Sequence, residues 1–151
     1  MLPVRKILYP TDFSSYSTQA YFHAIALAEN HRASLTILYV YQSGSHADEP
    51  SNRQFWREQL EQIRPINPAI SVHHVFLEGE PASAIVNYAS DAGIDLIVLG
   101  IHGKTSSDGQ LMGNVAQQVL RDAHCSVLAV KLPRGTPEAA TPIIGHPTEV
   151  N

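Results

Sequence analysis

The hydrophobic positions of this chain alternate between short continuous runs and longer segments with helical spacing. The runs are rich in β-branched and aromatic residues, which predicts strands, and they occupy residues 4–9, 34–41, 70–77, 95–100 and 125–132. Between the runs, apolar residues recur every three or four positions, as Ala20, Ala24 and Ala28 do, and this spacing predicts helices. The alternation of strands and helices predicts an α/β protein.

The run at 95–100 (DLIVLG) indicates how the sheet is covered. It is almost continuously apolar rather than alternating, which is typical of a strand buried on both faces. Parallel sheets with helices on both faces have such strands, and their crossover connections are right-handed. We therefore expect a single open parallel sheet of five strands between two layers of helices.

Proline, glycine and capping residues suggest where the helices begin and end. Ser51 is predicted to cap the second helix, which Pro65 terminates, and Pro81 falls in the first turn of the third. Gly93 is predicted to end the third helix in the left-handed conformation. The fourth helix is expected from about Asn114 to residue 124.

Composition restricts the class of protein. The 151 residues carry a formal charge of −4 and are 44% hydrophobic, which predicts a globular protein and argues against generic nucleic-acid binding. Cys125 is the one cysteine, so an internal disulfide is excluded. No signal peptide or membrane-spanning run is evident, and we expect a cytoplasmic protein. We expect one domain over residues 1–132 and a proline-rich, flexible tail over 133–151.

Ligands of open parallel sheets bind beyond the carboxyl ends of the strands, where the winding reverses. The first strand ends in Pro10-Thr11-Asp12, the second in Val40-Tyr-Gln, and the fourth runs into GIHGKTSSDGQLMGNV, residues 100–115. If the first and fourth strands are neighbours, Asp12 and the glycine-rich segment face each other across a crevice. Asp12 also has a simpler interpretation, as a cap of the first helix.

The glycine-rich segment has two interpretations. It has the form Gly-x2-Gly-x9-Gly, which is neither G-x-G-x-x-G nor a Walker loop. Its glycines would let backbone N–H groups approach an anion, and Gly113-Asn114 would open a helix whose positive end attracts phosphate, with Lys104 adding a charge. Alternatively the glycines only turn the chain, and Asn114 with Gln117 forms a capping box.

Three segments together resemble the universal stress protein family: ILYPTDFS at 7–14, GIHGKT at 100–105 followed by Gly113-Asn114-Val115, and CSVLAVK at 125–131. The resemblance covers about residues 3–132. It implies a Rossmann-like parallel sheet of strand order 3-2-1-4-5 and a homodimer formed through the last strand, Cys125–Leu132. The ATP-binding branch of the family is marked by Gly-x2-Gly-x9-Gly-Ser/Thr, and this chain departs from it because Asn114 replaces the hydroxyl residue.

The resemblance also implies roles for individual residues. Asp12, as an acceptor, and Val40, through its backbone or apolar surface, match positions that contact adenosine. The positions that wrap ribose and phosphates are Gly100, Gly103, Gly113, Asn114 and Val115. His102 lies within the same loop and is a candidate hydrogen-bonding partner of the ligand. The whole predicted nucleotide site is Pro10, Thr11, Asp12, Val40, Gly100, His102, Gly103, Lys104, Gly113, Asn114 and Val115.

The resemblance implies a dimeric stress-response or signalling protein that binds ATP or another adenine nucleotide. A carboxylate at Asp12 would repel phosphates unless it faces the adenosine end or shares a Mg²⁺ ion. No catalytic residue is assigned, and no protein metal site is expected, because the adjacent His73 and His74 point to opposite faces of a strand. Two alternatives stay open: an interaction module of the same fold that binds no nucleotide, and a slow ATP hydrolase.

Overall fold

Five parallel strands form the centre of the protein, in the order β3-β2-β1-β4-β5. We analysed a computed structural model, in which the described residues are 3–42, 50–101 and 110–131. The strands are β1 (Lys6–Pro10), β2 (Ser34–Tyr41), β3 (Val72–Glu78), β4 (Leu96–Ile101) and β5 (Ser126–Lys131). Both the predicted fold class and the predicted strand order are confirmed.

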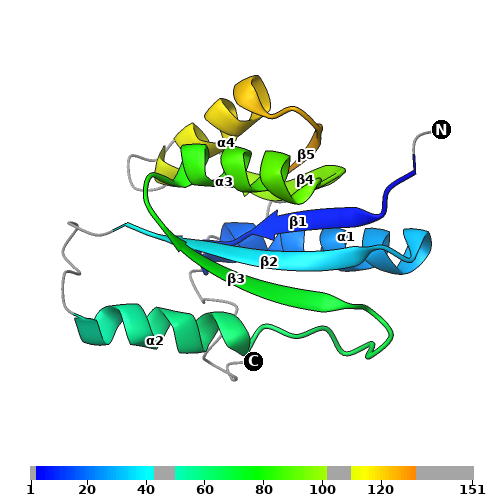
Figure 1. Cartoon of the computed structure of the whole chain (residues 1–151), viewed down its shortest axis with the longest axis horizontal. Coiled ribbons are helices and arrows are strands. Elements are labelled where there is room, and N and C mark those ends of the chain that lie inside the picture. Colours follow the sequence, from blue (N-terminus) through cyan, green and yellow to red (C-terminus); the bar gives the residue numbers. More distant parts are fainter. Residues whose placement is uncertain (1–2, 43–49, 102–109, 132–151) are drawn as a thin grey trace.

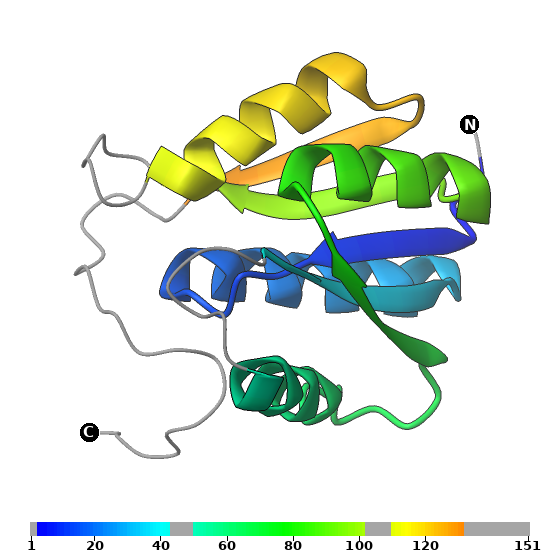
Figure 2. The ribbon, with the colours of Figure 1, turned by 60° about the vertical axis from the view of Figure 1, so that its left-hand side comes forward.

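The helices form a layer on each face of this sheet (Figure 1). They are α1 (Ser15–His31), α2 (Pro50–Glu61), α3 (Pro81–Ala92) and α4 (Gln110–Asp122). Figure 2 shows α1 and α2 on one side of the sheet and α3 and α4 on the other. No helix in the described ranges has the length and apolar character needed to span a bilayer.

Alternate residues of the same strand supply the two hydrophobic cores. In β1, Ile7 and Tyr9 pack with the α1 and α2 side, whereas Leu8 packs with the α3 and α4 side. In β4, Val98 belongs to the first core and Leu99 to the second. All five side chains have no exposed surface, which is the two-sided burial that the apolar runs predict.

The winding of the sheet reverses between β1 and β4. The chain proceeds outward from β1 to β2 and β3, and then returns to place β4 on the other side of β1. The β1–β4 pairing consists of Ile7 with Leu96 and Leu8 with Ile97, so it does not extend to Pro10 at the end of β1. An open parallel sheet has its ligand crevice at such a reversal.

Gly100 explains how closely α1 approaches β4. A Cβ atom at this position would lie 2.5 Å from the carbonyl oxygen of Tyr16 in the first turn of α1. The buried face of α1 consists of small residues, Ser17, Ala20, Ala24 and Ala28, which also permit a short distance between helix and sheet. Gly100 therefore has a packing role that is independent of any ligand.

The predicted helix limits are correct for α1 and α3, since capping residues at 11–15 precede α1 and Arg32 caps its end, and they differ for α2 and at the start of α4. Pro81 begins α3, and Gly93 caps its end with φ 70°. However, α2 begins at Pro50, so Ser51 lies inside it, and α2 ends at Glu61, before Pro65. Likewise α4 begins at Gln110, so Asn114 neither opens nor caps it. The spacing of apolar residues predicts that a helix is present but not the residue at which it begins, because the first turn of a helix need not contribute to the core.

Candidate functional site

A crevice of about 240 Å³ opens at the carboxyl ends of β1 and β2, beneath α3 and α4. It lies where the sheet winding reverses, as the sequence predicts. Five of the predicted site residues line it: Pro10, Thr11, Asp12, Val40 and Val115. The remaining lining residues are Leu38, Tyr39, Gln42, Pro81 and Ile85.

The backbone of Val40 contributes a hydrogen-bonding pair to this crevice. In a parallel strand, the N–H and C=O of one residue point to the same neighbour, and those of the next residue point to the other neighbour. The carbonyl of Leu38 accepts from Thr11 on the β1 side, and that of Tyr41 accepts from Gly79 on the β3 side. Val40 therefore directs both groups toward β1, beyond the last β1–β2 pair, Pro10 with Leu38.

Neither group of Val40 has a hydrogen-bond partner among the described residues. The Val40 residue is nevertheless buried, with 9% of its surface exposed. Buried backbone groups are almost always paired, so an unpaired donor and acceptor at the wall of a cavity indicate a place for a ligand or for water. This is the strongest chemical feature of the crevice.

Asp12 supplies the negative charge of the crevice. Its Oδ1 accepts hydrogen bonds from the backbone N–H of Ser14 at 3.0 Å and from the Ser14 hydroxyl at 2.5 Å. The cap of α1 is Ser14, whose side chain accepts from the N–H of Ser17. Asp12 thus orients the capping residue instead of capping the helix itself. No described donor reaches Oδ2, which leaves an acceptor for a ligand.

Thr11 lines the crevice, and its side-chain oxygen makes hydrogen bonds that stabilise the fold. Its Oγ1 lies 3.1 Å from the Ser17 hydroxyl and accepts from the N–H of Phe13 at 3.0 Å. The Tyr9 hydroxyl donates to the carbonyl of Ser17, and burial raises the pKa of Tyr9 far above its usual range. This neutral, buried network joins the end of β1 to the start of α1.

Phe13, the residue after Asp12, has an unusual backbone conformation. Its φ is 66°, although it is neither glycine nor asparagine. A bulky residue in this region costs roughly 1–3 kcal/mol, so surrounding contacts must hold it there. Its ring is buried against Trp56 of α2, at 5.0 Å between centroids, and against Tyr39, at 4.8 Å. The pKa of Tyr39 is raised to about 12 by burial, so its phenol stays neutral.

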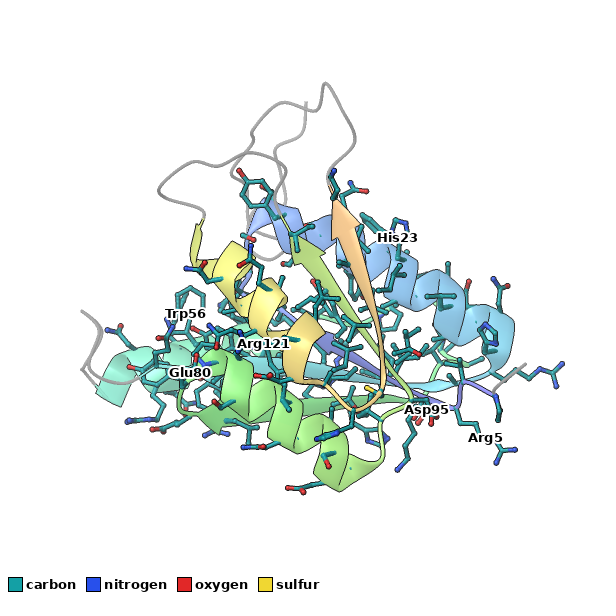
Figure 3. The ribbon with its side chains drawn as sticks, turned by 90° about the horizontal axis from the view of Figure 1, so that it is seen from above. Arg5, His23, Trp56, Glu80, Asp95 and Arg121 are labelled. Atoms are coloured by element: carbon teal, nitrogen blue, oxygen red, sulfur yellow. The ribbon has the colours of Figure 1, made fainter. Side chains whose placement is uncertain are left out.

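The start of α3 also faces the crevice, through Pro81. The backbone N–H groups of its first turn already have an acceptor, because the Glu80 carboxylate accepts from the N–H of Ser83 at 2.9 Å and from that of Ala82 at 3.3 Å. The Ser83 N–H is the main cause of a lowered pKa at Glu80. In Figure 3, Glu80 and Trp56 lie toward one end of the molecule, and Asp95 and Arg5 lie at the opposite end. Because Glu80 caps the start of α3, the N–H groups of that helix end are not available to an anion in the crevice.

The glycine-rich segment is only partly described. His102, Gly103 and Lys104 lie outside the described residues. Gly100 is not among the lining residues, and the face on which its side chain would stand is the α1 face. Gly113 lies in the first turn of α4, and Asn114 is exposed there and does not line the crevice. Only Val115 of this segment is a described wall residue.

Sequence reasoning missed half of the crevice wall. Leu38 and Gln42 flank Val40 at intervals of two along β2, so the period of a strand could have indicated them. Ile85 appeared in the sequence as part of an apolar helix stripe, with no sign that it faces a cavity. Its contribution depends on how α3 crosses the sheet, which the periodicity of one helix does not determine.

The described residues contain no group of three or more His, Cys, Asp or Glu side chains placed to hold a metal ion. A second cavity, of about 160 Å³, lies at the amino ends of the strands and is lined by Ala89, Ser90, Gly93, Ile94, His124 and Cys125. Burial raises the pKa of the Cys125 thiol, which keeps it protonated and unreactive at neutral pH. Among the described residues that line the first crevice, Asp12 is the one with a charged side chain.

A model of the universal stress protein family matches residues 3–131 of this sequence. The chain belongs to the universal stress protein family. A universal stress protein of Methanocaldococcus jannaschii is 34% identical over 142 residues, which cover 86% of this chain and 84% of that protein. Among solved structures, the universal stress protein UspA of Lactobacillus plantarum has a TM-score of 0.67 at 25% identity, covering 86% of this chain and 99% of its own.

Two further structures share the fold of this universal stress protein. One is a universal stress protein in complex with cAMP, with a TM-score of 0.66 at 21% identity, covering 85% of this chain and 98% of its own. The other is an Arabidopsis thaliana family member with AMP bound, with a TM-score of 0.59 at 16% identity, covering 86% of this chain and 93% of its own.

Proposed function

We propose that this protein binds an adenine nucleotide, ATP in the first instance, in the crevice between Asp12 and Val115. The observation that carries the proposal is that the N–H and C=O of Val40, in the wall of a mostly apolar cavity, have no hydrogen-bond partner in the described part of the chain. Two proteins of the same fold are described with adenine nucleotides, cAMP in one and AMP in the other. Their identity to this chain is low, and the main support for nucleotide binding is the crevice itself.

The crevice is suited to a purine base. The N–H of Val40 would donate to a ring nitrogen of adenine, and the C=O of Val40 would accept from the exocyclic amino group. Ile85 and Val115 supply an apolar surface from α3 and α4 for the faces of the base. A volume of about 240 Å³ is near the lower end of small-molecule sites, so the described crevice is of a size for the nucleoside rather than the whole nucleotide.

The Asp12 carboxylate would accept from a ribose hydroxyl through Oδ2. The phosphates would then extend toward the start of α4, away from the start of α3 that Glu80 caps. Asn114 lies exposed in the first turns of α4, where a carboxamide would donate to a phosphate oxygen. One carboxylate together with phosphates is an adequate ligand set for Mg²⁺, so Asp12 also fits a shared ion.

The function of such binding would be to shift the population of protein conformations that a partner recognises. A protein whose conformation, and therefore whose binding to a partner, depends on a bound nucleotide would act as a stress-response or signalling module. The two alternatives are an interaction module of the same fold without nucleotide and a slow ATP hydrolase. Sustained phosphate release over many turnovers that Asp12→Ala abolishes would favour the hydrolase.

The direct experiment is to denature the purified protein, identify any released nucleotide, and titrate the apo protein with ATP by calorimetry. We expect an adenine nucleotide to be released, and we expect Asp12→Ala to weaken ATP binding about tenfold, the loss of one hydrogen bond to a charged group. Asp91→Ala, an exposed carboxylate on α3 that does not line the crevice, is the matched control. Absence of both released nucleotide and heat at millimolar ATP would reject nucleotide binding.

We also propose that the protein is a homodimer formed through β5. Among the described residues this strand lies at the edge of the sheet and pairs with β4 alone, so one side of its backbone has no strand partner in this part of the chain. Residues 127–129 at its centre are only half-buried, although they are all apolar. A second copy of the strand would cover this edge.

A further inference from the structure

The side chain of Phe13 connects the crevice to α2, on the opposite face of the sheet. Asp12 lines the crevice between β1, β2, α3 and α4. Phe13 follows it directly, and its ring belongs to the core on the α1 and α2 side, stacked on Trp56 at 5.0 Å with an interplanar angle of 24°. Two consecutive residues thus face the two opposite layers of the protein.

The turn between these layers is held by several contacts at once. The Phe13 N–H donates to Thr11 Oγ1, and the N–H and hydroxyl of Ser14 donate to Asp12 Oδ1. Phe13 adopts a φ of 66°, which a phenylalanine keeps only while its surroundings enforce it. The ring of Phe13 anchors the turn to the core outside it, through its stack on Trp56 and its tilted contact with Tyr39. Loosening that stack would release the turn, and with it the position of Asp12.

We propose that Phe13 and Trp56 are positioning residues of the nucleotide crevice, whose stacked rings hold the strained turn that presents Asp12 to the ligand. The proposal rests on the proposed function for the identity of the ligand. Coupling of this kind is reciprocal: if the packing of α2 affects binding, then binding affects the surroundings of Trp56. Helix α2 is therefore the element whose packing, through Trp56, responds to the occupancy of the crevice.

The first test needs no ligand. Trp56 is the one tryptophan of the chain, so the fluorescence emission reports on its surroundings alone. Asp12→Ala removes the acceptor of both Ser14 hydrogen bonds, and we expect it to shift the emission maximum of Trp56 in the folded protein. The control Asp91→Ala changes an exposed carboxylate on α3 and should leave the spectrum unchanged. Superimposable spectra of the Asp12→Ala variant and the parent protein would overturn the proposal.

The second test measures ATP affinity by calorimetry in variants of α2. We expect Trp56→Leu to weaken binding about tenfold, the range of coupling found between residues that share a contact network, and Trp56→Phe to restore most of it. Phe55→Leu, which removes an exposed ring that contacts Trp56 edge-on at 4.9 Å, is the matched control and should bind ATP normally. Equal affinity of the folded Trp56→Leu variant and the parent protein would overturn the proposal.

A second variant covers the case in which Trp56→Leu does not fold. Phe13→Leu keeps an apolar side chain in the core but removes the ring, so it should fold with reduced stability and bind ATP more weakly than the parent protein. Unaltered affinity in that variant would equally overturn the proposal. If the parent protein itself gives no heat with ATP, the proposed function fails, and the ligand-free fluorescence measurement alone decides whether Trp56 and Asp12 are coupled.

Discussion

At the scale of single residues, Gly100 has two possible roles, contact with a ligand and close packing against α1. The family resemblance places Gly100 among the residues that wrap ribose and phosphates. Its missing side chain also accommodates the first turn of α1, since a Cβ would meet the backbone of Tyr16 and Ser17 at 2.5 to 3.2 Å. Contacts with fixed backbone atoms cannot be relieved by a side-chain rotation, so a substitution there must displace the helix.

We expect Gly100→Ala to destabilise the protein by about 1–3 kcal/mol, the usual cost of overpacking a well-packed site. The comparison is Gly93→Ala, where φ is 70° and a Cβ meets nothing within 4 Å, so that only the backbone strain of about 1 kcal/mol is expected. Urea denaturation of both variants measures the difference. Gly100→Ala with the stability of the parent protein would contradict the close approach of α1.

Asn114 is the second residue whose role can be tested, because the ATP-binding branch that this chain resembles has Ser or Thr at that position. The residue is exposed within α4, so Asn114→Ala should leave the fold intact. If its carboxamide donates to a phosphate oxygen, the variant should bind ATP roughly tenfold more weakly, as for a lost hydrogen bond to a charged group, and bind adenosine unchanged. Parallel calorimetric titrations with the two ligands measure this. An equal loss for ATP and adenosine would place Asn114 away from the phosphates.

At the scale of elements, the start of α3 depends on a charge. Glu80 caps the helix with its carboxylate, and hydrogen bonds from Ser83 and Ala82 lower its pKa. A carboxyl group whose pKa is lower in the folded state stabilises the protein above the pKa of the unfolded state. This stabilisation disappears as the pH falls through the folded-state pKa.

Glu80→Gln is therefore expected to lower the stability of the protein by about 0.5 kcal/mol at pH 7, the usual value of an anion at an exposed helix start. The difference from the parent protein should shrink below about pH 4.3, where carboxyl groups begin to protonate, and vanish below the lowered pKa of Glu80. Urea denaturation at a series of pH values tests this. A difference that stays constant down to acid pH would show that the charge is not the cause.

The elements of this fold could largely be predicted from the sequence, and the walls of the crevice could not. Apolar runs such as 34–41 are confirmed as strands, since a strand that is buried on both faces is apolar at most of its positions. The start of α4 was misplaced because Gly113-Asn114 has the composition of a helix start, yet the helix begins a turn earlier, at Gln110. The place of Ile85 in the crevice wall and the positive φ of Phe13 depend on packing between segments that are distant in the sequence. A local sequence pattern does not determine that packing.

At the scale of the whole molecule, the site and the proposed dimer edge belong to different parts of the sheet. The crevice lies by β1 and β2, and the edge strand β5 is separated from β1 by β4. Dimer formation through β5 would therefore leave the crevice walls formed by β1 and β2 uncovered. The topology permits binding of a nucleotide and dimer formation at the same time.

Sedimentation equilibrium should give the mass of a dimer, and Ala129→Asp, at the centre of β5, should shift it toward the monomer of 16.5 kDa. The reason is that two copies of the charge would be buried close to each other at the interface. A circular dichroism spectrum equal to that of the parent protein is the control for folding. A monomer mass for the parent protein at all concentrations would reject the dimer.

The central claim is that the crevice at the end of β1 and β2 binds an adenine nucleotide through the backbone of Val40. Nuclear magnetic resonance titration of the ¹⁵N-labelled protein with ATP tests it most directly. We predict that the largest amide shifts occur at Val40, Asp12 and Val115, and that the amides lining the second cavity, at Gly93 and Cys125, do not move. Saturable shifts confined to other residues, or no shifts at millimolar ATP, would contradict the claim.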